Sequence, residues 1–462
     1  MSSRGNFSSK IGFIAAASGS AVGLGNIWRF PFEVANGGGA AFLIIYINFC
    51  FLLCLPLMIT EIAIGRKTQR DASSAFAHLG FPKWSILGKM GILASIIGLS
   101  LYYVIAAWSF GYFLEMLIGN FSIGAQFNDY IKDVIKIGFY GLIFLSITAF
   151  IVSKGISGGV EKASKILMPA LLVLLIFIAC YALTLPNAFQ GISFYLVPDF
   201  SEIKLPIIYT ALGQAFFSLS LGMAIHITFG SFVSKNDNIL SSASAITLTD
   251  VGVAFLAGIM IFPIVAYQSS GVIEGVNGGP GLIFQTLPSV FESLGPWMGV
   301  LIGSCFFLLL TFAALTSAVS LLEVPVTYLV DQHKVRRNLA VILMTIFIFL
   351  LGIPSLIGNG YSSFFTNFIQ YGSEGTPTDF LTFLIHTNDV IMLSGGFLIS
   401  IFGAYKWGKS NLNNEIAVGN PAYKGSKAEK LIKLMISYFC PIVLGLILIL
   451  TILDRYFGIT LV

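Results

Sequence analysis

The stretch Gly19-Ser-Ala-Val-Gly-Leu-Gly-Asn-Ile-Trp-Arg-Phe-Pro31 lies inside the first apolar segment of the chain, which runs from Ile11 to Phe32. This segment is long enough to span a bilayer, yet its middle holds three closely spaced glycines followed by Asn26 and Arg29. Each glycine weakens a helix by roughly 1 kcal/mol, and an arginine in a membrane helix costs about 2.5–3.5 kcal/mol. Bare backbone at membrane depth is tolerated where it is buried in protein or lines a wet cavity. The stretch therefore predicts a broken helix around an ion or solute site.

The composition places the chain in a lipid bilayer. Of its 462 residues, 56% are hydrophobic and 10% are charged, whereas a soluble domain carries about 25% charged residues. The formal net charge of +4 is too small to indicate a nucleic-acid partner. The four histidines form no metal-binding pattern. These properties indicate an all-α polytopic membrane protein and give no support to an enzyme.

The apolar pattern divides into eleven predicted membrane spans. They lie near residues 11–36, 40–65, 86–118, 138–154, 166–185, 206–233, 240–268, 296–330, 338–357, 380–405 and 430–454. Four basic residues fall outside on this topology (Lys132, Lys136, Lys204 and Arg455), Arg29 falls within the membrane, and the other 20 of the 25 Lys and Arg residues share the side of the N-terminus. Because basic loops favour the cytoplasm, we expect a cell (inner) membrane protein with a cytoplasmic N-terminus. Since eleven is odd, its C-terminus should be outside.

A second interruption occurs in the sixth span. The segment 206–233 contains Gly213-Gln-Ala-Phe-Phe-Ser-Leu-Ser-Leu-Gly222, where glycine and polar residues alternate with apolar ones. Corresponding breaks five spans apart are typical of transporters with inverted repeats and a site at the membrane midplane. We therefore predict a single transporter domain over 1–462, built from two inverted five-helix repeats with broken helices 1 and 6. Repeat one covers about 11–185, repeat two about 206–405, and an extra span about 430–454.

The polar residues near the two breaks suit a small hard cation, which prefers oxygen ligands. Candidate donors are the freed carbonyls of span one and the side chains of Asn26, Ser218, Ser220, Thr316 and Ser317. An isolated Ser or Thr in a membrane helix usually bonds its own helix backbone, but two broken helices favour an ion site. The half-helix N-termini suit a substrate carboxylate, and the whole set fits an amino acid.

Other polar residues within the spans allow two interpretations each. Glu61 is either a structural tie to unwound backbone or a proton-coupling carboxylate. Asp250 is either a fixed negative charge near the ion site or a helix-satisfied carboxylate near the inner membrane surface. Tyr102 and Tyr103 either cap the substrate pocket or simply pack in the core.

Several strings together carry a resemblance to a known family. They are Gly25-Asn-Ile-Trp-Arg-Phe-Pro31, Asn36-Gly-Gly-Gly-Ala40, Pro56-Leu-Met-Ile-Thr-Glu-Ile-Ala-Ile-Gly-Arg66, Gln214 through Gly222, and Ala313-Ala-Leu-Thr-Ser317. In them the chain resembles the neurotransmitter:sodium symporter family, and within it the bacterial leucine/hydrophobic amino-acid transporter type. The resemblance implies two inverted five-helix repeats and sodium-coupled amino-acid uptake by alternating access.

The resemblance also implies two sodium sites. The first would use the carbonyl of Ala21 and the side chains of Asn26, Ser218 and Thr249. Thr249 departs from the amide that leucine-type members carry there. The second site would use the carbonyls of Gly19, Val22 and Ala313 with the hydroxyls of Thr316 and Ser317, and all five match the family pattern.

A substrate site and two gates follow from the same resemblance. The substrate contacts would be Ser20, Ala21, Leu24, Gly25, Leu99, Tyr103, Phe217, Ser218, Ser220, Met223, Ser317 and Leu321. Tyr103 and Phe217 would form an aromatic lid. Arg29 would belong to an outer ion-pair gate whose acidic partner is either Asp379 or Asp389. Arg4 and Asp331 would form the inner gate.

The resemblance extends to the substrate, sodium release and chloride. Gly23 stands where family members that carry amines without a carboxylate have an aspartate, so we expect a zwitterionic amino acid, with an apolar or aromatic side chain. Gly159 and Pro169 have the spacing associated with unwinding span five to release sodium inward. The position that meets chloride in dependent relatives is Val253, which has no oxygen, and Asp250 lies one helical turn away. We therefore expect Asp250 to balance the sodium charge and chloride not to be required.

A nutrient sensor built on a transporter scaffold is the competing function. Such a sensor would want a sizeable signalling domain, whereas the longest segment between predicted spans is only a loop.

Overall fold

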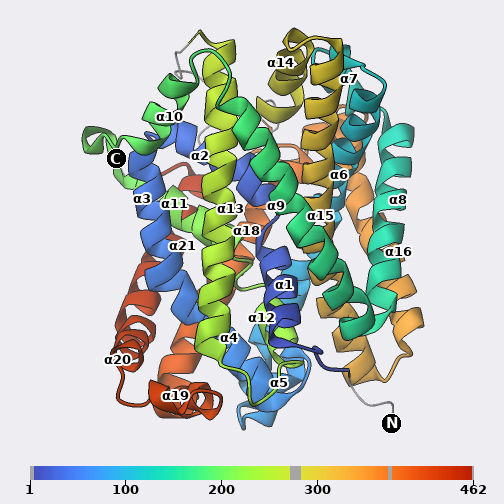
Figure 1. Cartoon of the computed structure of the whole chain (residues 1–462). Coiled ribbons are helices and arrows are strands. Elements are labelled where there is room, and N and C mark those ends of the chain that lie inside the picture. Colours follow the sequence, from blue (N-terminus) through green and yellow to red (C-terminus); the bar gives the residue numbers. More distant parts are fainter. Residues whose placement is uncertain (1–4, 271–281, 373–376, 460–462) are drawn as a thin grey trace.

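The computed structural model describes residues 5–270, 282–372 and 377–459, and these form a bundle of helices (Figure 1). Nine helical runs in these ranges are long and apolar enough to cross a membrane. They are Ala40–Thr68 (α3, η2, α4), Pro82–Leu117 (η3, α6), Val134–Ser153 (α8), Ile156–Ala182 (η5, α9), Ile239–Gln268 (α13), Pro296–His333 (α15), Arg337–Ile357 (α16), Phe380–Lys406 (α18, η8) and Lys427–Phe457 (α20, η10, α21). The multi-pass membrane architecture is thereby confirmed.

The first predicted span is broken where its glycines lie. Helix α1 (Lys10–Ala21) ends at the break, and η1 with α2 (Gly25–Asn36) continues at an angle of 51°. Val22 leaves the helical region with ψ of 101°. A Cβ on Gly23 would lie 2.6 Å from Ser317 Oγ, so only glycine allows this backbone to approach α15 so closely.

The sixth predicted span is also broken. It consists of α11 (Leu205–Ser218) and α12 (Ile225–Gly230), each too short to span a membrane alone. Between them Ser220, Gly222 and Ala224 all have positive φ, at 53°, 76° and 59°. A Cβ on Gly222 would lie 2.2 Å from the carbonyl oxygen of Met392. Ordinary helix therefore cannot continue through this segment, and its peptide groups turn toward the interior.

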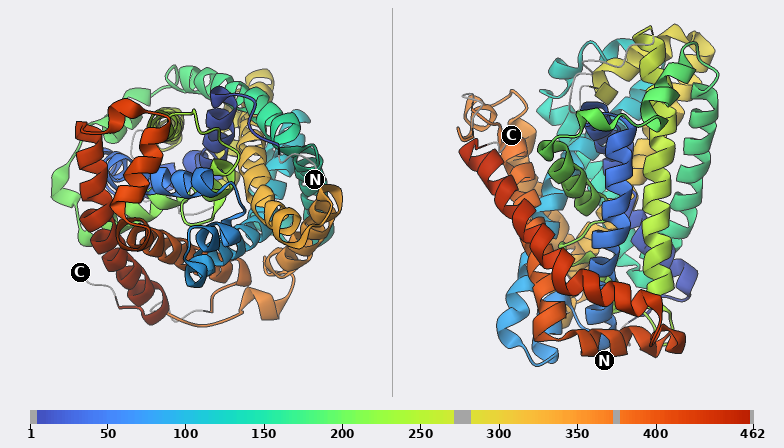
Figure 2. Two further views of the ribbon diagram at one scale, coloured as in Figure 1. Left: turned by 90° about the horizontal axis from the view of Figure 1, so that it is seen from below. Right: turned by 90° about the vertical axis from the view of Figure 1, so that its left-hand side faces the viewer.

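Shorter elements cap the two ends of the bundle. They are α5 (Ala72–His78), η4 (Phe121–Ile123), α7 (Phe127–Tyr130), α10 (Ala188–Leu196), η6 (Phe200–Glu202), η7 (Leu282–Thr286), α14 (Leu287–Ser293), α17 (Ser363–Thr366), α19 (Lys409–Val418) and η9 (Pro421–Tyr423). Helices α5, α19 and α20 lie at one end, with the start of α1, and α7, α10 and α14 lie at the other, toward which α21 rises (Figures 1 and 2). The first and last spans thus begin and end at opposite ends of the bundle, as an odd number of spans requires.

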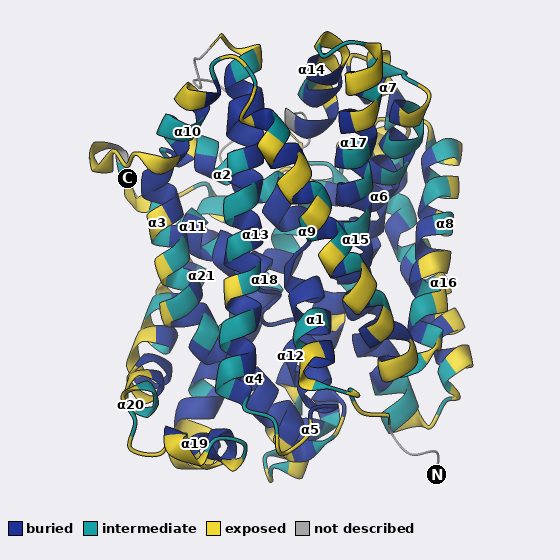
Figure 3. Cartoon of the chain, viewed as in Figure 1, coloured by how far each residue is buried: buried dark blue, intermediate teal, exposed yellow. Residues whose placement is uncertain are grey.

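Burial separates the interior of the bundle from its lipid-facing surface (Figure 3). Exposed apolar side chains include Ile135 and Phe150 on α8, Val173 on α9 and Leu350 on α16. The central helices α6 and α15 pack along each other and are largely buried. An apolar exterior with a partly polar interior is what a bilayer-embedded bundle requires.

The prediction for the fifth span was wrong at its start. The helix begins at Ile156, ten residues before the expected 166, with the π-helical turn η5 (Ile156–Glu161). Because Glu161 and Lys165 are charged, the apolar pattern did not indicate this start. They pair at 2.6 Å, and Glu161 also accepts from Ser8, at the end of the bundle where α1 begins.

Candidate functional site

A buried cluster joins the first break to helices α11 and α13. Asn26 Nδ2 donates to Asp250 Oδ1 at 2.7 Å and lies 3.0 Å from Ser218 Oγ. Ser218 Oγ donates to Asp250 Oδ2 at 2.8 Å, and Tyr46 Oη donates to the same oxygen at 3.3 Å. Asp250 and Asn26 are wholly buried. The four side chains form a buried polar site around one carboxylate, here called the carboxylate cluster.

The structure corrects the assignment of Thr249 to this cluster. Thr249 Oγ1 donates to the carbonyl of Ala245 at 2.8 Å within its own helix, while Asp250 faces Asn26. Successive residues of a helix point about 100° apart, so an offset of one residue moves the predicted ligand off the site. Of the two interpretations of Asp250, the geometry supports a charge at the candidate ion site, because its carboxylate bonds three other elements rather than its own helix.

A second cluster contains no charged group. Thr316 Oγ1 lies 3.0 Å from the carbonyl oxygen of Ala313 and 3.4 Å from that of Val22. Ser317 Oγ lies 3.4 Å from the carbonyl oxygen of Gly19 and 3.5 Å from that of Val22. The structure thus brings together the five residues that were predicted for the second sodium site. We call this set the neutral cluster.

A pocket lies between the two clusters at the helix breaks. Its lining residues are Ser20, Ala21, Gly23, Gly25, Gly98, Leu101, Tyr102, Phe217, Ser218, Ser220, Met223, Ser317, Leu321 and Asn388. Ser220 Oγ donates to the carbonyl of Ser20 at 3.1 Å, which ties the two breaks together. The pocket contains nine of the twelve predicted substrate contacts, and none of its lining side chains is charged.

Three predicted contacts lie elsewhere. Leu24 lines an outer cavity of about 340 Å³, outside the pocket. Leu99 is buried in the core, and Tyr103 Oη donates to the carbonyl of Phe349 on α16 at 3.0 Å.

Tyr102, Gly98 and Leu101 occupy the places that the sequence assigned to Tyr103 and Leu99. Tyr102 Oη accepts from Leu24 N at 3.1 Å, which holds it against the first break. Tyr102, rather than Tyr103, therefore lines the pocket together with Phe217. The error is again one residue on a helix, which turns a side chain to a different neighbour.

Buried groups hold the second break open. The backbone N–H of Gly222 donates to Glu61 Oε1 at 3.0 Å, and His226 Nε2 lies 2.8 Å from the carbonyl oxygen of Leu219. Ser95 Oγ donates to the carbonyl of Met223 at 2.6 Å. These bonds satisfy peptide groups that the helix no longer pairs. They support the interpretation of Glu61 as a structural tie.

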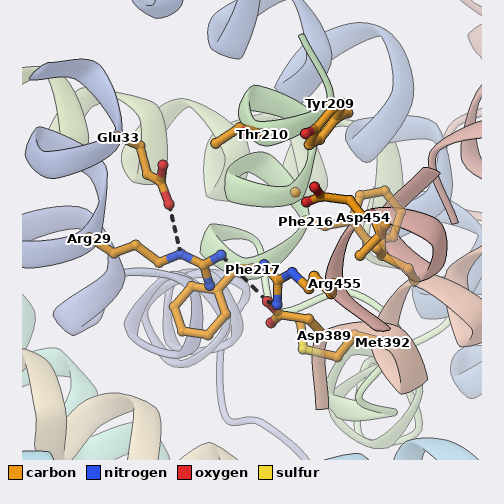
Figure 4. Close-up of a pocket in the computed structure, with 13 residues that line it drawn as sticks. Arg29, Glu33, Tyr209, Thr210, Phe216, Phe217, Asp389, Met392, Asp454 and Arg455 are labelled. Carbon is orange, nitrogen blue, oxygen red and sulfur yellow. Dashed lines mark hydrogen bonds and ion pairs between the residues drawn. The ribbon is translucent and has the colours of Figure 1, made fainter. Parts of the chain in front are cut away.

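An ion network lies beside the pocket, in a second cavity that shares Phe217 with it (Figure 4). Arg29 lies 3.5 Å from Asp389 and 3.4 Å from Glu33, and its guanidinium stacks 4.7 Å from the ring centre of Phe217. The structure thus chooses Asp389 as the partner of Arg29. The alternative, Asp379, instead caps the start of α18 by accepting from Thr382 N at 2.9 Å.

Arg455 is a member of this network that sequence reasoning missed. Its Nη1 lies 2.8 Å from Asp389 Oδ2, the oxygen that also faces Arg29. The sequence counted Arg455 only as an external charge, although its position near the end of the last span was a usable signal. Asp389 therefore retains Arg455 as an ion-pair partner whether or not Arg29 stays in place.

The inner gate is only partly described. Arg4 lies outside the described residues, while Asp331 lies in the last turns of α15 and is partly buried. Near this end of the bundle, the carbonyl of Phe232 accepts from Phe7 N at 3.2 Å. Gly159 lies in η5 and Pro169 within α9, and Met168 of that helix packs 3.5 Å from the Cβ position of Gly19.

Comparison with known proteins assigns this arrangement to a family. A sequence model of the sodium:neurotransmitter symporter family matches residues 4–133 and 125–457. The chain belongs to this family. It is 37% identical over 426 residues to an uncharacterized sodium-dependent transporter, YhdH, of Bacillus subtilis, covering 90% of this chain and 91% of the relative. Its relatives are transporters rather than enzymes.

More distant relatives and a solved structure extend the comparison. The human sodium- and chloride-dependent GABA transporter 2 is 26% identical over 429 residues, covering 80% of this chain and 70% of that protein. The crystal structure of MhsT in complex with L-phenylalanine superposes with a TM-score of 0.86 at 38% identity, covering 96% of this chain and 99% of MhsT. The predicted fold class is thereby confirmed.

Proposed function

We propose that this protein is a sodium-coupled symporter for a zwitterionic amino acid with an apolar or aromatic side chain. The observation that carries the proposal is an uncharged pocket between two broken helices, flanked by two clusters of oxygen donors. The similarity to MhsT, whose structure holds L-phenylalanine, supports the class of substrate. In this proposal sodium and the amino acid are transported together across the bilayer.

The two clusters are the proposed sodium sites. The first comprises the carbonyl of Ala21 with Asn26, Ser218 and Asp250, the last replacing Thr249. The second is the neutral cluster of Gly19, Val22, Ala313, Thr316 and Ser317. Both sets consist of hard oxygen ligands, which suit sodium, and both depend on carbonyls that the break in span one releases from the helix.

The substrate would bring its own carboxylate to this site. The pocket has no acidic side chain and Gly23 supplies none, so an amine lacking a carboxylate would leave the sodium charges unbalanced. Ser20 Oγ is buried without a hydrogen-bond partner among the described residues and is available to the substrate. Phe217, Met223 and Leu321 give the side-chain end its apolar character.

Alternating access would use the two gates in turn. Arg29 and Asp389, with Tyr102 and Phe217 beneath them, close the outer path. Arg4 and Asp331 are the proposed inner gate. The proposed orientation, with the N-terminus in the cytoplasm and the C-terminus outside, places the ion network of Asp389 on the external side of the cell membrane.

Within this scheme we expect span five to release sodium inward. Proline removes a backbone hydrogen bond and glycine permits distortion, which suits Gly159 and Pro169 to a helix that unwinds. The contact of Met168 with Gly19 places the same helix beside the neutral cluster.

Chloride should not be required. Asp250 would supply the negative charge that offsets sodium, and Val253 on the same helix is buried and apolar. Neutralising a buried cation with a fixed carboxylate needs no diffusible anion.

Uptake by purified protein in liposomes tests the function directly. An inward sodium gradient should drive accumulation of phenylalanine, leucine or tryptophan, while choline in place of sodium should abolish it and lithium should support it poorly. The decarboxylated analogue phenethylamine should not be carried. Specific amino-acid binding without any flux would instead favour the sensor, and equal uptake in choline would refute sodium coupling.

A further inference from the structure

Asn388 is a buried polar residue of the pocket that the sequence did not single out. It lies on α18 one residue before Asp389, and only 4% of it is exposed. Its Nδ2 donates to Met392 Sδ at 3.4 Å. Its carbonyl oxygen Oδ1 is buried and has no hydrogen-bond partner within the described part of the chain. A buried amide oxygen without a partner is unfavourable, so the group calls for an external donor.

The amide group of Asn388 lies at the apolar part of the pocket, with its nitrogen Nδ2 nearest to Gly98. Gly98 has no side chain there, and the atoms nearest to its Cβ position are Asn388 Nδ2 at 3.5 Å, Leu321 Cδ2 at 3.7 Å and Met223 Sδ at 3.8 Å. Every one of these contacts is at ordinary van der Waals distance or beyond. Glycine at this position therefore leaves space bounded by one amide and two apolar side chains.

The other polar side chains of the pocket gather at the helix breaks. They are Ser20, Tyr102, Ser218, Ser220 and Ser317. Tyr102 bonds Leu24 N, and both Ser220 and Ser317 bond the carbonyl of Ser20. The pocket thus has a polar end, suited to the ammonium and carboxylate of an amino acid, and an apolar region with Asn388 as its amide.

We propose that Asn388 Oδ1 accepts a hydrogen bond from the side chain of the transported amino acid. The protein then prefers a large apolar side chain that carries one N–H or O–H group over the same shape without it. This inference rests on the proposed function, because it requires an amino acid in the pocket. A purely apolar pocket discriminates weakly between such isosteres, whereas an acceptor that the wrong substrate leaves unpaired discriminates strongly.

Competition assays with matched pairs test the proposal. Liposomes are placed under an inward sodium gradient, and uptake of labelled phenylalanine is measured against unlabelled competitors. Tryptophan is compared with 3-benzothienylalanine, in which sulfur replaces the indole N–H, and tyrosine is compared with phenylalanine. In at least one pair the wild type should prefer the donor-bearing member by about tenfold, the value of one well-formed buried hydrogen bond. Asn388→Leu, which keeps size but removes both polar atoms, should bring that ratio close to one.

Met392→Leu is the matched control. It removes the sulfur that Asn388 Nδ2 contacts but retains Oδ1, so the preference for the donor-bearing member should persist. If Asn388→Leu yields no uptake, the same ratio is measured with Asn388→Ala by competition binding to detergent-solubilised protein. Equal affinity within both pairs in the wild type, or an undiminished ratio after removal of the amide, overturns the inference while leaving the proposed function intact. Absence of sodium-driven uptake of any amino acid would instead refute the proposed function.

Discussion

The carboxylate cluster and the neutral cluster share the broken first span but differ in charge. In the carboxylate cluster, Asn26, Ser218 and Tyr46 donate hydrogen bonds to the carboxylate of Asp250. The neutral cluster has only hydroxyls and carbonyls, from Thr316 and Ser317 of α15 and from Gly19, Val22 and Ala313. A cation in the first would meet a full negative charge, whereas a cation in the second would meet dipoles alone. Loss of the carboxylate should therefore be far more damaging than loss of any one neutral ligand.

The largest expected effect is that of Asp250→Ser. Removing the carboxylate leaves a cation in this cluster without its counter-charge, a defect that costs about 3–5 kcal/mol at buried sites. At 1.36 kcal/mol for each factor of ten, uptake without chloride should fall at least about 100-fold. The wild type should transport equally in gluconate and chloride, and chloride should partly restore the variant.

Thr249→Val is the matched control for this prediction. Its hydroxyl bonds its own helix, so the sodium dependence of uptake should stay within about twofold of the wild type. A wild type that loses transport in gluconate would show that Asp250 does not replace chloride. A Thr249→Val protein as damaged as Asp250→Ser would show that the cluster is wrongly assigned.

Thr316→Val should have an intermediate effect. The change keeps the shape of the side chain but removes one neutral oxygen from the second cluster, which should raise the half-saturating sodium concentration about tenfold. The measurement is uptake as a function of external sodium. Thr311→Val is the comparison on the same helix, because Thr311 Oγ1 donates to Phe307 O at 2.8 Å and belongs to neither cluster. Equal sodium dependence in the two variants would contradict a site at Thr316.

The smallest expected effect is that of Tyr46→Phe. The hydroxyl of Tyr46 supports Asp250 from 3.3 Å and Ser218 from 3.1 Å, so its loss should raise the half-saturating sodium concentration only about threefold, as for one hydrogen bond of modest strength. Tyr103→Phe, whose hydroxyl bonds Phe349 instead, should leave it unchanged. If Tyr46→Phe matched Asp250→Ser, the carboxylate would not be the dominant element of its cluster.

The residues of the neutral cluster were predicted on two grounds. The closely spaced glycines of span one located the break and its freed carbonyls, and Thr316 and Ser317 were candidate oxygen ligands of span eight. The exact set, with Gly19, Val22 and Ala313, came from the family resemblance, and the structure brings these five residues together. A broken helix exposes its carbonyls wherever it breaks, so the break itself could be located from local sequence.

The carboxylate cluster and the pocket were predicted only approximately. The sequence predicted Thr249 where the structure has Asp250. It predicted Tyr103 and Leu99 where the structure has Tyr102, Gly98 and Leu101. The span Pro82–Leu117 is 78% buried over its most apolar window. It therefore has no single lipid-facing side from which the rotation of the helix about its axis could be inferred. A one-residue offset on such a helix changes every neighbour without changing the hydropathy pattern.

The sequence by itself determined the membrane architecture and the two breaks. These follow from composition and from local backbone preferences, which act over a few residues. The resemblance of its motifs to a family added the residues of the neutral cluster and the meaning of Gly23. The tertiary structure decided the rest: that Asp250 meets Asn26, that Asp389 is shared by Arg29 and Arg455, and that Asn388 enters the pocket. Each of these contacts joins residues on different helices, and their meeting depends on how those helices are rotated and packed, which no local pattern records.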